Sequence, residues 1–153
     1  MYWLTQIALI VAILIVIAIP MWLWESRAKR KKLEETFADR QPLDERTFYE
    51  RYFRARGVPF FVVSKVREIL EEELEADLSH LSAEDDFKKN LSFFWRYDST
   101  ADVEIVVRLE KEFDIKITDA EVEKTNTVED LVNLVWFKLQ QRAANNSLNR
   151  SAS

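Results

Sequence analysis

The sequence predicts an all-α protein in which an N-terminal single transmembrane helix precedes a four-helix bundle. Two observations support this prediction. Residues 1–24 contain no charged side chain and consist mainly of Ile, Leu, Val and Ala. From residue 60 onward, apolar residues recur every three or four positions, which is the period of helices that bury one face. We therefore divide the chain into a transmembrane anchor at 1–24, a charged juxtamembrane linker with a short aromatic helix at 25–59, a helical domain at 60–142 and a disordered tail at 143–153.

The N-terminal segment is long enough to cross a bilayer, because 24 helical residues extend about 36 Å. A cleaved signal peptide fits less well, since the basic n-region is missing and the apolar run is too long. Residues 27–32 then contain five bases and no acid, which by the positive-inside rule places the C-terminal domain in the cytoplasm. Aromatic residues flank the segment, as expected at the two membrane interfaces: Tyr2, Trp3, Trp22 and Trp24. We expect a single-pass membrane protein with a cytoplasmic C-terminal domain.

Aromatic residues at helical spacing predict the short helix in the linker, over residues 44–56, and we expect it to pack on the domain. Within the domain, three main helices and a minor one at 119–124 are expected to bury one core. The β-branched run at 105–107 lies within the helical period, so no sheet is expected. The three predicted apolar stripes are Val62, Val63, Val66, Ile69, Leu70 and Leu74; Val103, Val106, Leu109 and Phe113; and Val128, Leu131, Val132, Val135 and Leu139.

Composition excludes several classes of site. The chain has no cysteine, one histidine and one glycine. This composition excludes sites that use a thiolate, metal sites built from several histidines, and Gly-rich loops that bind phosphate. A hydrolase that uses a His-based triad is disfavoured, because His80 stands without an orienting partner in the sequence. Residues 98–130 carry eleven carboxylates against four bases. Such an acidic surface suits a basic protein partner and repels nucleic acid. We therefore predict neither catalytic residues nor a metal site.

Ser99 stands at the predicted start of the second helix of the bundle, after Asp98 and before an amphipathic run. Ser99 and Asp102 have the spacing of a capping box, in which the serine hydroxyl and the acid each accept a backbone N–H. The same signature begins at Ser82, Thr118 and Thr127. Helix capping alone would therefore explain this serine.

The wider pattern points to a second interpretation. An apolar helix leads to Phe87, Asp98-Ser99 opens the next helix, Glu-Phe-Asp-Ile at 112–115 closes it, and Thr-Val-Glu-Asp at 127–130 begins the last one. Ser99 stands fourteen residues before Phe113. In these features, over about 75 residues, the chain resembles the acyl carrier protein family.

The resemblance implies a carrier rather than an enzyme, with 4′-phosphopantetheine attached covalently to Ser99 and acyl groups held as thioesters on that arm. It further implies that Asp98, Asp102 and Glu104 lie on the surface read by a phosphopantetheinyl transferase and by acyl-transferring enzymes. The expected setting is lipid or fatty acid metabolism at the membrane.

Two departures from the family pattern favour an alternative function. Thr100 stands where the family usually has Leu, and an aromatic segment, residues 91–97, replaces a short turn before Ser99. The alternative is an arm-less carrier fold that serves as an adaptor and docks a basic partner. The aromatic segment itself would shield the arm, gate a pocket, face the membrane or add packing to the core.

Overall fold

The computed structural model describes the backbone of residues 2–151, and the side chains of all of these except residues 2, 4, 21–23, 25 and 148–151. The chain divides into two compact units, Met1–Thr36 and Phe37–Ser153. We describe each unit by itself.

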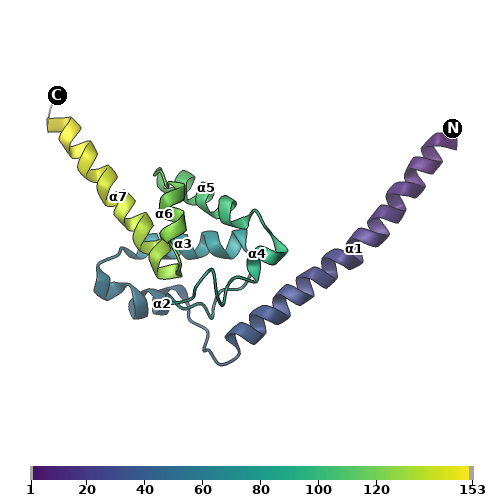
Figure 1. Cartoon of the computed structure of the whole chain (residues 1–153), viewed down its shortest axis with the longest axis horizontal. Helices are drawn as coiled ribbons and strands as arrows, with labels where there is room; N and C mark the ends of the chain where they lie inside the picture. Colours follow the sequence, from purple (N-terminus) through teal and green to yellow (C-terminus); the bar gives the residue numbers. More distant parts are fainter. Residues whose placement is uncertain (1, 152–153) are drawn as a thin grey trace. The chain divides into compact units, whose positions relative to one another are not determined.

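The first unit lies within one helix, α1 (Tyr2–Phe37), drawn in purple and blue in Figure 1. Every side chain from residue 5 to residue 20 is exposed, although most of them are apolar. The transmembrane helix expected at residues 1–24 finds no support in the described part of the chain, where no helix is both long and apolar enough to cross a membrane. Of the aromatic residues expected at membrane interfaces, Trp3 and Trp24 are exposed, whereas the side chains of Tyr2 and Trp22 lie outside the described residues.

The second unit is helical, and its described residues contain no strand, only an isolated bridge between Asp86 and Thr127. Helix α3 contacts both α5 and α7, and α5 also contacts α7 and α4. Figure 1 shows this bundle in blue, teal, green and yellow. Its elements are α2 (Glu45–Tyr52), a 3₁₀ turn η1 (Arg54–Arg56), α3 (Phe60–Glu73), α4 (Phe94–Tyr97), α5 (Ala101–Phe113), α6 (Asp119–Lys124) and α7 (Val128–Ser151).

The apolar stripe predicted for α3 is buried in full, and so is the stripe of α7 except for Leu139, which is half-buried. The stripe predicted for α5 is wrong in its first half. Val103 is 61% exposed, whereas Ile105 is 4% exposed and faces the core. Positions four apart carry the buried face of this helix, because that spacing keeps side chains on one side. The buried residues of α5 are Ala101, Ile105, Leu109 and Phe113.

The minor helix predicted at 119–124 is present as α6, and a capping box between Thr118 and Glu121 begins it. The Glu121 carboxylate also accepts a hydrogen bond from Lys138 of α7 at 2.6 Å. Together with the N–H of Thr118, this contact lowers the pKa of Glu121 to about 2. The ion pair fixes α6 to α7. This contact matters because a helix as short as α6 is not stable by itself.

Helix α7 continues to Ser151, where we expected a disordered tail from residue 143. The structure differs because adding residues to an existing helix costs little once its first turns are fixed by packing. Val132 and Val135 supply that packing, since both are at most 1% exposed. Residues 152–153 lie outside the described residues.

The compact unit begins at Phe37 rather than at the expected boundary of residue 60. Part of the predicted linker is therefore part of the domain. Five apolar residues of this segment are at most 7% exposed: Phe37, Leu43, Phe48, Phe53 and Val58. The aromatic helix packs on the domain as expected, and charged neighbours in the sequence concealed how much of the segment is buried.

An ion pair between the half-buried Arg40 and the buried Asp85 holds this N-terminal segment to the rest of the domain. Two nitrogens of Arg40 donate to the two carboxylate oxygens of Asp85, at 2.7 and 2.8 Å. Asp85 is 2% exposed and also accepts hydrogen bonds from the N–H of Ser82 and the side-chain amide of Asn90. These donors are needed because a buried carboxylate is stable only when it is paired and hydrogen-bonded.

Candidate functional site

Ser99 lies in the exposed bend between α4 and α5. Its hydroxyl makes no hydrogen bond within the described part of the chain, and the predicted capping box with Asp102 is not formed. The residue that caps α5 is Thr100, whose side chain makes no capping hydrogen bond. By contrast, the box at Thr118 is present, as noted above. Capping therefore does not account for Ser99, and its hydroxyl is accessible for modification.

Asp98 shapes the bend around this serine. Its Oδ1 atom accepts from the backbone N–H of Thr100 at 2.9 Å and from the Thr100 hydroxyl at 2.8 Å. This is an Asx turn, a local alternative to helical hydrogen bonding. Of two adjacent hydroxyls, the turn engages that of Thr100 and leaves that of Ser99 exposed.

The other two residues predicted to bind partners, Asp102 and Glu104, are both exposed in the first turn of α5. Carboxylates are favourable at this end of a helix because of its dipole. Asp98 lies three residues before the first residue of α5, so all three predicted acids lie near the end of the helix that Ser99 precedes. We call these three acids, Asp98, Asp102 and Glu104, the acidic rim.

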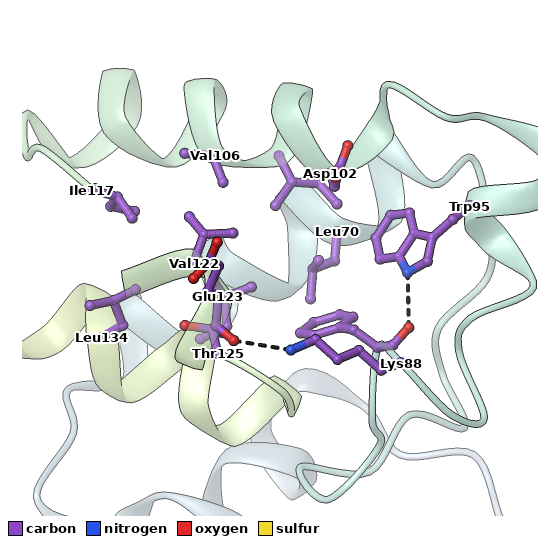
Figure 2. Close-up of a pocket in the computed structure, with 13 residues that line it drawn as sticks. Leu70, Lys88, Trp95, Asp102, Val106, Ile117, Val122, Glu123, Thr125 and Leu134 are labelled. Atoms are coloured by element: carbon purple, nitrogen blue, oxygen red, sulfur yellow. Dashed lines mark hydrogen bonds between the residues drawn. The ribbon is translucent and has the colours of Figure 1, made fainter. Parts of the chain in front are cut away.

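A pocket of about 470 Å³ lies between α3, α5, α6 and α7. Figure 2 shows Trp95 and Asp102 at one end of it and Ile117 and Leu134 at the other. The lining is mainly apolar, and is made by Leu70, Phe87, Lys88, Trp95, Asp102, Ile105, Val106, Ile117, Val122, Glu123, Thr125, Leu131 and Leu134. Apolar walls with a few polar groups are typical of small-molecule sites.

Sequence reasoning did not locate this pocket. It joins the loop before Ser99 to the connection between α6 and α7, and no local pattern reports such a contact. We predicted that Val103 is buried, and this error obscured the face of α5 that lines the pocket. Asp102 and Val106, four residues apart, lie on that face. The helical spacing of Asp102 and Val106 was the one available signal.

Hydrogen bonds brace the loop that forms one wall. The Phe87 N–H donates to the Asn126 carbonyl at 2.8 Å, and the Lys88 ammonium donates to the Glu123 carbonyl at 3.0 Å. Two further backbone bonds run from the start of α7 to this loop, from Val128 to Asp85 and from Glu129 to Ala83. These backbone hydrogen bonds hold residues 83–87 against residues 126–129, and we call this contact the staple.

The aromatic segment, residues 91–97, serves two purposes. Leu91, Phe93 and Phe94 are at most 5% exposed and pack in the core. Trp95 is half-buried, lines the pocket, and donates its indole N–H to the Phe87 carbonyl at 2.8 Å. Added core packing, one of the expected roles, is therefore present, and Trp95 is the member of the segment that reaches the pocket.

These residues fit the group that the sequence resemblance implies. Ser99 is exposed, and no described residue hydrogen-bonds its hydroxyl, which leaves that oxygen available for a phosphodiester. The first turn of α5 presents backbone N–H groups and the positive end of a helix dipole to a phosphate. The apolar pocket opens beside that turn, where Asp102 forms part of its lining.

Comparison with known proteins points to the same prosthetic group. Residues 64–135 match the family described as "Phosphopantetheine attachment site". An acyl carrier protein of Clostridium acetobutylicum is 36% identical over 74 residues, which are 48% of this chain and 91% of that protein. A crystal structure of an acyl carrier protein from Thermotoga maritima aligns with a TM-score of 0.44 and 31% identity, over 53% of this chain and 89% of that chain. The chain therefore belongs to the acyl carrier protein family, as a carrier with covalently attached 4′-phosphopantetheine and not as an enzyme.

Proposed function

We propose that the chain presents a thioester-linked acyl or related group to partner enzymes, on a phosphopantetheine arm attached to Ser99. The observation that carries the proposal is that Ser99 is exposed and its hydroxyl makes no hydrogen bond to any described residue, while Asp98 engages the neighbouring Thr100 hydroxyl. A hydroxyl in this state meets a transferase without first breaking an internal bond.

The residues around Ser99 position the arm. The Ser99 oxygen is the tether, and the N–H groups of the first turn of α5 favour the phosphate that follows it. When attached, the group supplies a thiol that this cysteine-free chain lacks. Chemistry on the cargo then belongs to the partner enzymes.

We further propose that the acidic rim, Asp98, Asp102 and Glu104, is read by the phosphopantetheinyl transferase and by acyl-transferring enzymes. Exposed charges of one sign speed the encounter with a surface of the opposite sign. A basic partner would therefore approach the end of α5 that carries Ser99.

Intact-mass spectrometry tests the carrier function. After co-expression with a broad-specificity phosphopantetheinyl transferase, we expect the full chain to gain the mass of one phosphopantetheine group, located by peptide mapping at Ser99. An unchanged mass would contradict the proposal. It would instead support the adaptor alternative, in which the acidic rim docks a basic partner and no arm is attached.

We also propose that residues 1–24 anchor this carrier in a membrane, with the C-terminal domain in the cytoplasm. Because no described helix is long and apolar enough to cross a membrane, this part rests on the uncharged sequence of residues 1–24 and on the bases of residues 27–32. Large exposed apolar side chains along α1, such as Leu9 at 62% and Val16 at 68%, also favour an apolar environment. Anchoring would concentrate the carrier near membrane-bound enzymes.

Fractionation of cells tests the anchor. We expect the full chain to sediment with membranes and to resist alkaline extraction, because an apolar segment of this length is released only by detergent. A variant that lacks residues 1–24 is the control and should remain in the soluble fraction. Release of the full chain by alkaline buffer would contradict the anchor, and digestion of the C-terminal domain by protease added to intact cells would contradict its cytoplasmic location.

A further inference from the structure

We propose that Trp95 determines which cargo enters the pocket, admitting straight acyl chains and excluding branched or ring-bearing ones. The proposal rests on the proposed function, since cargo reaches the pocket only when it is tethered at Ser99. It assigns a specificity role to a residue of the aromatic segment.

The position of Trp95 relative to the tether supports this role. Ser99 lies in the sequence between two residues of the pocket wall, four residues after Trp95 and three before Asp102. Figure 2 shows both wall residues at the same end of the pocket. Cargo tethered at Ser99 therefore meets this end first.

The indole is also held in place. Its N–H donates to the Phe87 carbonyl at 2.8 Å, and the two rings lie 6.2 Å apart between centroids, tilted by 45°. Phe87 is itself fixed through its N–H to Asn126. Moving the indole aside would leave a partly buried donor and acceptor unpaired, which costs free energy. We therefore expect a wide cargo group to require this displacement of the indole, and a straight chain to enter without it.

The rest of the pocket explains why apolar cargo enters at all. Besides polar groups such as Lys88 and Glu123, the lining includes aliphatic side chains such as Ile105, Leu131 and Leu134. Each methylene that moves from water to this lining adds to the hydrophobic driving force. Discrimination by shape therefore acts on a cargo class that the pocket already favours.

The test measures how well the domain protects its thioester. Full-length chain is loaded at Ser99 with a straight or a branched acyl chain of equal carbon number, loading is confirmed by intact mass, and thioester cleavage by hydroxylamine is timed. In the wild type, we expect the straight chain to be cleaved about tenfold more slowly than the branched chain, a ratio typical of discrimination by an apolar pocket. In Trp95→Ala and Trp95→Leu, this ratio should fall to about twofold or less.

The control is Trp136→Ala, which removes a half-buried tryptophan that does not line the pocket and should keep the wild-type ratio. Circular dichroism checks that each variant is folded, and the leucine variant serves if the alanine variant is not. An unchanged ratio in a folded Trp95 variant would overturn the specificity role alone. Failure of the wild type to gain phosphopantetheine in the mass measurement would overturn the proposed function.

Discussion

Replacing Ser99 by alanine should abolish phosphopantetheine attachment completely. The side chain is exposed and its hydroxyl makes no hydrogen bond in the described part of the chain, so the substitution removes the tether and little else. Exposed sites of this kind change the free energy of unfolding by less than about 0.5 kcal/mol. Intact mass after co-expression with the transferase should show unmodified protein only, with a helical circular dichroism spectrum equal to that of the wild type.

Thr100→Ala is the matched control, because it removes the adjacent hydroxyl. That hydroxyl is engaged by Asp98, and the backbone N–H of Thr100 still donates to the same carboxylate in the variant. We therefore expect Thr100→Ala to be modified. Attachment that persists in Ser99→Ala, or that is lost only in Thr100→Ala, would assign the arm to a different hydroxyl.

Replacing Asp85 by alanine should lower the free energy of unfolding by about 1.5–3 kcal/mol, the range for lost hydrogen bonds to a charged group, because the Arg40 side chain left behind is 36% exposed to solvent. The substitution leaves the Arg40 guanidinium without its carboxylate and removes the acceptor for Ser82 and Asn90. It also loosens the N-terminal segment, which contributes Phe48 and Phe53 to the core. For a small domain, this loss is a large fraction of the total stability.

Urea unfolding of the full chain, followed by circular dichroism, measures this change. Glu84→Ala is the control, since Glu84 is an exposed acid directly beside Asp85 and should cost less than about 0.5 kcal/mol. If Asp85→Ala unfolds at the same urea concentration as the control, the pair with Arg40 does not hold the N-terminal segment in place.

Periodicity predicted the helices well, because burial of one face is a local property of the sequence. The stripe of α3 and the bounds of α6 needed no tertiary information. The α5 stripe was misassigned because Val103, Ile105, Val106 and Val107 are all apolar, so the sequence allows more than one register. Packing selects Ile105, and only the fold shows that Val103 and Val107 remain exposed.

Sequence reasoning named the residues of the candidate site but not their surroundings. Spacing and resemblance led to Ser99 and to the three acids at the start of α5. The sequence did not show that Asp98 accepts a hydrogen bond from Thr100 rather than from Ser99. The spacing of Ser99 and Asp102 is that of a capping box, and it carries no information about this contact. The pocket and the N-terminal boundary escaped prediction for a common reason, since both depend on contacts between distant segments, such as Arg40 with Asp85.

The staple between residues 83–87 and 126–129 has a consequence for the order of folding. Helices α5 and α6 lie between its two ends, so closing it requires a long loop whose entropy must be overcome. Contacts within single helices form faster than contacts of this kind. We therefore expect this wall of the pocket to be completed after the single helices have formed, so that Ser99 is exposed before the cavity is finished.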